Sequence, residues 1–143
     1  MKKNDGDGNI FVDTNIIVGA FAGLEKDCKC LEYLFSSAID RRRLFLSSLS
    51  IAQFVATFQR RKADDKEIRN YVKNLLAKFN IINFTENDVK ESLDFKEGDM
   101  EDAIQFILGK KVRCFYYVTN NTKDYSKLKN IKVINSRKVR NIY

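Results

Sequence analysis

The sequence predicts a single α/β domain built on a parallel sheet that helices cover. Two observations predict it. Segments with helical and with strand patterns alternate along the 143 residues, and the strand segments are continuously apolar. A continuously apolar strand is buried on both faces, which is typical of a parallel sheet between helices. The length suits one domain with a sizeable core.

The first half of the chain alternates strand and helix. Residues 9–12 are β-branched and aromatic, and they form the first predicted strand. Apolar residues then recur at helical spacing in 16–21 and in 27–40, which predicts two helices. Residues 44–46 are the second strand, and the helix after it carries the apolar residues of 51–58.

The second half continues this alternation. Residues 68–79 carry apolar side chains at i, i+3, i+4, i+7, i+8 and i+11, which is the clearest amphipathic helix in the chain. A short strand in 81–84 and two helices, over about 86–94 and 100–108, follow it. Two further apolar runs are the last predicted strands: 114–118 and 131–134.

The composition excludes several kinds of chemistry. The chain has no histidine, so it cannot contain a Ser-His-Asp triad, a Cys-His pair or a His-ligated metal site. Its three cysteines (Cys28, Cys30 and Cys114) are expected to be reduced thiols, because their odd number and spacing fit neither a disulfide framework nor a four-ligand zinc site. No signal-peptide core or membrane-length apolar run occurs, so a cytoplasmic protein without a membrane partner is expected.

Positive charge is concentrated at the end of the chain. Residues 104–143 contain ten basic side chains against one acidic side chain, Asp124, whereas the total charge is +7. A basic segment beside a mildly acidic one suggests a polyanionic partner, although a solvated basic face remains the alternative. Tyr116, Tyr117 and Tyr125 could stack on nucleic-acid bases, but aromatic residues in a buried strand more often belong to the core.

Polar residues gather where the predicted parallel strands end, which is where such sheets bind ligands. They are Asp13, Gln53, Asp99, Glu101, Asp102, Asn120 and Asn121. Clustered carboxylates without histidine suit a hard cation such as Mg²⁺ or Mn²⁺. Such an ion could activate a water molecule against a phosphodiester, and the basic segment could hold the phosphate backbone.

Helix capping is the competing role for several of these residues. Asp13 could cap the helix after the first strand, and Asp99 with Asp102 fits a capping box. Ser48 or Ser50 and Thr85 are expected to cap two other helices. Asn120 and Asn121 could be turn residues, and Asp124 could be a surface or capping carboxylate.

Three segments in order resemble a PIN domain. I-F-V-D-T-N-I-I-V at 10–18 is similar to the opening of that family, and D-M-E-D-A at 99–103 matches its later acidic segment. V-T-N-N-T-K-D-Y at 118–125 is similar to the family stretch V-T-x-[DN]-x-x-D-[FY]. The resemblance covers about residues 9–135, so we expect a polar leader over 1–8 and one PIN-like domain over 9–143.

The resemblance implies a three-layer α/β/α sandwich with a central parallel sheet of about five strands. It implies an endoribonuclease that depends on Mg²⁺ or Mn²⁺ and acts on single-stranded or structured RNA. Many small members are toxins that an antitoxin protein neutralises, and they often form homodimers. Carried over position by position, Asp13 and Asp102 match the acidic metal-binding residues, and Asn121 matches the fourth catalytic position. Thr14, Asn15 and Thr119 would position substrate or water.

One position departs from the family pattern. Gln53 stands where the family usually has glutamate, and an amide adds no charge and cannot act as a base. Two carboxylates are within the normal range for Mg²⁺, and Asp99, Glu101 or Asp124 could compensate for the missing one. A catalytically weakened or inactive PIN-like module that binds RNA or protein is therefore the alternative. A phosphatase or receiver fold is disfavoured, because Asp13-Thr14-Asn15 lacks the second aspartate of a phosphatase D-x-D motif and the chain has no acidic pair early in its first strand.

Overall fold

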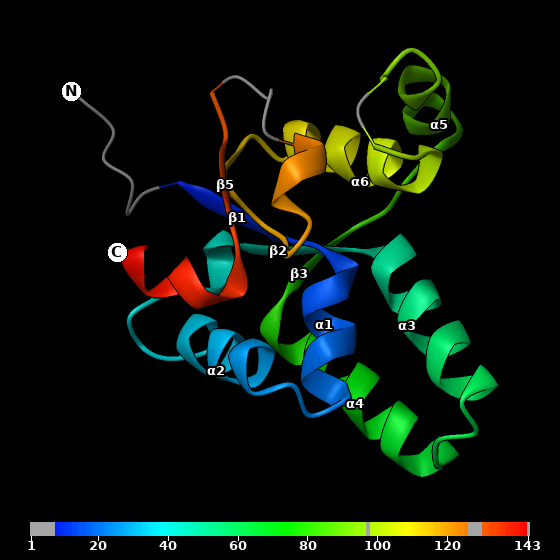
Figure 1. Cartoon of the computed structure of the whole chain (residues 1–143), viewed down its shortest axis with the longest axis vertical. Coiled ribbons are helices and arrows are strands. Elements are labelled where there is room, and N and C mark those ends of the chain that lie inside the picture. The colour runs from blue at the N-terminus through cyan, green and yellow to red at the C-terminus, as the bar shows by residue number, and fades with distance from the viewer. Residues whose placement is uncertain (1–7, 97, 126–129, 143) are drawn as a thin grey trace.

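The fold is a five-stranded parallel sheet between two layers of helices (Figure 1). The computed structural model describes residues 8–96, 98–125 and 130–142. The strand order is β3-β2-β1-β4-β5, and every neighbouring pair is parallel. The strands are β1 (Asn9–Val12), β2 (Leu44–Ser47), β3 (Asn80–Ile82), β4 (Cys114–Val118) and β5 (Lys132–Ile134). The predicted α/β/α sandwich is therefore confirmed.

The helices divide between the two faces of the sheet (Figure 1). The first four helices, with the last short turn η4, pack on one face, and α6, with the turn η3, packs on the other. The helices are α1 (Thr14–Phe21), α2 (Glu25–Leu34), α3 (Ser48–Arg60), α4 (Asp65–Lys78), α5 (Glu86–Ser92) and α6 (Met100–Lys111). The 3₁₀ turns are η2 (Arg41–Arg43), η3 (Thr122–Tyr125) and η4 (Ser136–Asn141).

The strand residues alternate between two hydrophobic cores. Ile10 and Val12 belong to the larger core under α1–α4, whereas Phe11 between them belongs to the core under α6. This alternation follows from the two-residue period of a strand, so a continuously apolar strand fills both cores. Tyr116, Tyr117 and Tyr125 are all buried, which makes them core side chains rather than exposed surfaces for bases.

Two expected helix boundaries are wrong. The second helix ends at Leu34 instead of continuing to 40, and the Ser36 hydroxyl donates to the Tyr33 carbonyl (2.6 Å). Such a local side-chain bond competes with further helical bonding. The cap of α3 is Ser47, whose Oγ accepts from the Ser50 N–H (2.9 Å), rather than Ser48 or Ser50 itself. Thr85 caps α5 as expected.

Two other expectations concern the polar leader over residues 1–8 and the membrane. The predicted polar leader lies outside the described residues except for Gly8, whose carbonyl accepts from Arg43 Nε (2.8 Å). Both edge strands of the sheet, β3 and β5, are only three residues long. Across the described ranges, no helix has the length and apolar character needed to span a membrane.

Candidate functional site

The polar residues that follow β1 and β4 meet at the carboxyl edge of the sheet. These two strands are neighbours with Val12 paired to Val118, so Asp13 and Thr119 leave the sheet side by side. The Asp13 N–H donates to the Val118 carbonyl (2.9 Å), which holds the end of β1 against β4. Parallel pairing therefore brings together residues that are more than a hundred positions apart in the sequence.

Asp13 is the buried carboxylate at the centre of this edge, with only 5% of its surface exposed. It is also the N-cap of α1, because its Oδ1 accepts from the Thr14 N–H (2.7 Å). Its Oδ2 accepts from the Thr119 hydroxyl (2.8 Å) and from Asn15 Nδ2 (3.3 Å). The capping and functional interpretations of Asp13 are thus compatible, since each uses a different part of the side chain.

Thr119 and Asn15 form the frame around Asp13. Asn15 Nδ2 also donates to Thr119 Oγ1 (3.0 Å), so the three side chains are mutually bonded. Thr119 Oγ1 accepts from the backbone N–H of Asn121 (3.0 Å), and this bond fixes the chain just after β4. Asn121 is half-buried there. The structure therefore brings Asp13, Asn15, Thr119 and the Asn121 backbone into one cluster.

Burial raises the pKa of Asp13 from its usual 3.8 to about 6. The hydrogen bonds from Thr119 and Thr14 lower this pKa again, but they do not offset the desolvation. The negative charges of Asp102 and Glu101 raise it further, which places both carboxylates near Asp13. Asp13, Asp102 and Glu101 form what we call the acidic half of the site.

The start of α6 supplies the other carboxylates. Asp99 is exposed and caps α6, with its Oδ1 accepting from the Asp102 N–H (2.8 Å), while Asp102 Oδ2 accepts from the Asp99 N–H (3.2 Å). Asp99 is thus engaged as a cap. Glu101 is exposed at the rim, and partial burial and the charges of Asp99 and Asp102 raise its pKa.

Glycine is required just before this capping box. Gly98 has a φ of +70°, and a Cβ built there would lie 2.8 Å from Asp102 Oδ2. A side chain at this position would therefore both strain the backbone and push the Asp102 carboxylate out of place.

A neutral hydrogen-bond network lies next to the acidic half. It consists of Thr14, Ser47, Ser50, Gln53 and Gln105, and we call it the neutral network. Gln105 Nε2 donates to Thr14 Oγ1 and to Ser50 Oγ, both at 2.7 Å, and its Oε1 accepts from Ser47 Oγ (2.8 Å). In the described part of the chain, no buried side-chain nitrogen or oxygen lacks a hydrogen-bond partner.

Gln53 takes part in this network through its carbonyl oxygen. Gln53 Oε1 accepts from the Thr14 hydroxyl (2.6 Å), while Thr14 Oγ1 also lies 2.7 Å from Ser50 Oγ. Gln53 thus stands beside the residue that follows Asp13, as expected from the sequence, but its amide oxygen is already engaged. Asp124 lies in η3, and its side chain is outside the described part of the structure.

Two polar residues of this region, Asp27 and Gln105, were not predicted from the sequence, and both are bonded to residues of the site or next to it. Asn120 accepts from the Ser136 hydroxyl (2.9 Å) through Oδ1 and donates to Asp27 Oδ1 (2.8 Å) through Nδ2. Asp27 is fully buried and occupies the apolar stripe of α2, so its place among core positions was a usable signal. Gln105 gave no such signal, because the partners of its side chain lie on other elements.

The donor set fits a divalent cation that is held by few protein ligands. In residues 8–96, 98–125 and 130–142, no three acidic or cysteine side chains form a group that could hold a metal ion. Two carboxylates with amide and hydroxyl oxygens remain, and Mg²⁺ is usually bound by one or two carboxylates together with water and substrate phosphate. Burial, and to a smaller extent the charges of Asp102 and Glu101, disfavour the ionised form of Asp13, and a cation placed there would stabilise that form.

This chain is similar to ribonucleases and to toxin–antitoxin proteins of known structure. Ribonuclease VapC1 of Aquifex aeolicus is 27% identical over 128 residues, which cover 82% of this chain and 84% of that protein. A toxin–antitoxin complex from Klebsiella pneumoniae aligns with a TM-score of 0.65 at 21% identity, covering 86% of this chain and 95% of that one. VapC20 of Mycobacterium tuberculosis, a toxin that cleaves the sarcin–ricin loop, aligns with a TM-score of 0.63 at 15% identity, covering 87% and 99%.

The solved structures share less than 25% identity, so they support the fold rather than the activity. The family assignment comes from the sequence itself. The PIN domain family matches residues 10–114, a span that includes all of β1 but Asn9, together with Asp13 and the whole of α6. The chain therefore belongs to the PIN domain family.

Proposed function

We propose that this protein is a divalent-metal-dependent endoribonuclease and the toxin of a toxin–antitoxin pair. One observation carries the proposal: a buried carboxylate, Asp13, lies at the carboxyl edge of a parallel sheet beside the charges of Asp102 and Glu101. The similarity to Ribonuclease VapC1 supports the choice of RNA as the substrate. The structural neighbours from toxin–antitoxin complexes support an antitoxin partner.

Asp13 and Asp102 are the residues that would hold Mg²⁺ or Mn²⁺ in this proposal. When bound, such an ion lowers the pKa of a water molecule and offsets negative charge on the phosphodiester. Asn15 and Thr119 hold the Asp13 carboxylate in one orientation through their hydrogen bonds. Thr14 and the Asn121 segment would contact the substrate, since they flank Asp13 at the same edge.

The test is cleavage of labelled single-stranded and hairpin RNA with Mn²⁺, with Mg²⁺ and with EDTA. We expect cleavage with either ion and none with EDTA. Asp13→Asn should reduce the rate by at least about a hundredfold, the scale of losing a principal electrostatic group. The matched control is Asp64→Asn, because Asp64 also caps a helix but lies at the start of α4. Metal-dependent cleavage that Asp13→Asn leaves unchanged would contradict the assignment.

A second candidate function is binding of RNA or protein without catalysis. It is favoured by Gln53, which adds no charge and already accepts a hydrogen bond from Thr14. RNA binding in EDTA without cleavage in either ion would support this candidate. Cleavage gained by Gln53→Glu alone would mean that a PIN domain lost its chemistry through this one position.

A further inference from the structure

The helix α2 and the C-terminal turn η4 lie side by side (Figure 1). Their side chains line an open groove. Its volume is about 640 Å³. Cys30 and Val139 are buried beneath it, and the ends of several basic side chains surround it. The groove is thus formed by two segments more than a hundred residues apart in the sequence, and it is separate from Asp13 and Asp102.

The charge of the groove is unbalanced. Its only carboxylate among the described residues, Glu25, is paired with Lys29 at 2.8 Å. Lys26, Arg137 and Arg140 also line the groove, and none of them forms an ion pair with a described residue. The groove therefore presents three positive charges that nothing in the described chain neutralises.

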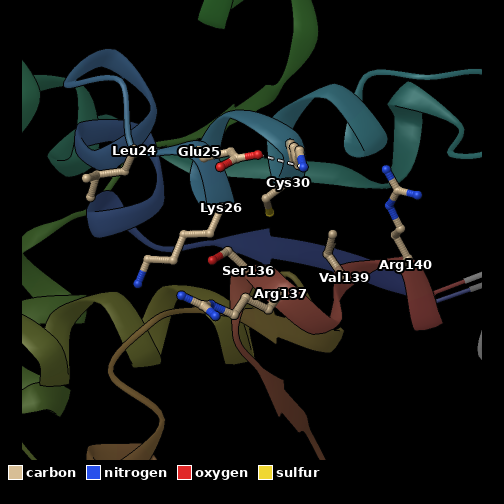
Figure 2. A pocket seen from close by; sticks show the side chains of 9 residues that line it. Leu24, Glu25, Lys26, Cys30, Ser136, Arg137, Val139 and Arg140 are labelled. Atoms are coloured by element: carbon tan, nitrogen blue, oxygen red, sulfur yellow. Dashed lines mark ion pairs between the residues drawn. The ribbon is translucent and has the colours of Figure 1, made fainter.

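These cations are spread along the groove. Figure 2 shows the charged ends of Lys26 and Arg137 at one end of it, near Ser136, and Arg140 at the other end. The dashed line that starts at Glu25 in Figure 2 marks its ion pair with Lys29, one turn further along α2. A single small anion could meet one end, but an extended chain of negative charges is needed to meet both.

Hydrogen bonds connect this groove to the candidate site. Ser136, which lines the groove, donates through both N–H (3.2 Å) and Oγ (2.9 Å) to Asn120 Oδ1. The Asn120 N–H donates to Asn15 Oδ1 (3.1 Å), and Asn15 Nδ2 donates to Asp13 Oδ2 (3.3 Å). Two residues, Asn120 and Asn15, therefore connect the basic groove to Asp13, and the two sites are held in a fixed relation.

We propose that the α2–η4 groove binds the sugar–phosphate backbone of the RNA strand next to the phosphodiester at Asp13. The proposal rests on the proposed ribonuclease function. Lys26, Arg137 and Arg140 contact successive parts of the backbone and read no base, so the groove adds affinity without sequence preference. An acidic protein segment has similar charge, but the hydrogen-bonded path through Asn120 and Asn15 to Asp13 favours the substrate.

The experiment measures binding of fluorescent single-stranded RNA in EDTA over a range of KCl concentrations. The test variant carries Lys26→Gln, Arg137→Gln and Arg140→Gln. The matched control carries Arg60→Gln, Lys66→Gln and Lys73→Gln, three exposed cations of α3 and α4 that remove the same charge elsewhere. Thermal unfolding of each variant checks that the fold is kept.

The test variant should bind RNA on the order of tenfold more weakly, and the slope of log K against log salt should fall by about 2. Each phosphate contact on a single strand contributes about 0.7 to that slope. The control should keep both values near those of the wild type. Equal losses in the two variants would overturn the proposal, because they would reflect total charge alone.

Unchanged RNA binding in the test variant would also overturn it. If the same variant then lost binding to poly-glutamate, the groove would be assigned to an acidic protein partner. Cleavage is measured separately, with Mn²⁺ on the same RNA. Absence of cleavage by the wild type would contradict the ribonuclease, while the groove is judged from binding in EDTA.

Discussion

The acidic half and the neutral network lie side by side at the same edge of the sheet. They differ in how far hydrogen bonds compensate the burial of their polar groups. In the neutral network every hydroxyl and amide is bonded to another, so burial leaves no polar group unsatisfied. In the acidic half, hydrogen bonds do not compensate the burial of Asp13, and its pKa is raised to about 6. The neutral network therefore fixes geometry, whereas the acidic half is stabilised by binding a proton or a cation.

The largest expected effect is the dependence of stability on pH. Asp13 binds its proton more tightly in the folded state, with a pKa of about 6 against 3.8. Between these values the unfolded chain loses the proton and the folded chain keeps it. The free energy of unfolding contributed by Asp13 therefore falls as the pH rises from about 4 to 6, by roughly 3 kcal/mol.

This contribution is measured as the difference between the wild type and Asp13→Asn in urea denaturation at each pH. Other carboxylates titrate in both proteins and cancel in the difference. At pH 7, Mn²⁺ should stabilise the wild type and not Asp13→Asn, because only the former has the charge that binds it. Two parallel pH curves would show that Asp13 is not the buried carboxylate with a raised pKa described above.

Gln105→Leu should break the neutral network. It removes hydrogen bonds to Thr14, Ser47 and Ser50 and leaves buried hydroxyls short of a partner. We expect a loss of about 2 kcal/mol in the free energy of unfolding, measured by urea denaturation at neutral pH. Gln59→Leu on the exposed surface of α3 is the control and should stay within about 0.5 kcal/mol of the wild type. A comparably small effect of Gln105→Leu would mean that the network does not contribute to stability.

Gln53→Glu should place a negative charge in the neutral network, next to the carboxylates of the acidic half. The carboxylate can accept the same bond from Thr14, so the fold is kept and one negative charge is added. We expect Mn²⁺ to bind about tenfold more tightly by titration calorimetry, since ligand charge tunes the affinity for such ions. Gln59→Glu on the same helix adds the same charge away from the site and should leave the affinity unchanged. Identical affinities in the two variants would place Gln53 outside the cation site.

The smallest expected effect concerns Asp99. Asp99→Ala removes the cap of α6 and should cost about 1 kcal/mol, whereas Asp99→Asn keeps an acceptor and should cost much less. Thermal or urea unfolding distinguishes the two. Equal destabilisation by alanine and asparagine would show that the charge of Asp99, rather than its capping oxygen, is what matters.

The fold and the framework of the site were predictable because both depend on local patterns. The apolar runs marked all five strands, and a parallel sheet necessarily gathers the residues that follow them, Asp13 and Thr119 among them. The neutral network was not predictable. Ser50 and Gln105 are 55 positions apart, and their bond depends on how α3 and α6 approach the sheet. The only local sign of such contacts in the sequence is a polar residue on the buried face of a helix, such as Asp27 in α2.

The three-residue edge strands have a consequence for how this protein meets other chains. An exposed edge recruits another strand only when it offers a long row of free backbone groups. Here β3 and β5 offer very short rows, and Lys132 on β5 places an exposed charge at one of them. Extension of the sheet by a second polypeptide is therefore disfavoured, both as a route to aggregates and as a mode of recognition. A partner protein is expected to attach to the helical surfaces instead.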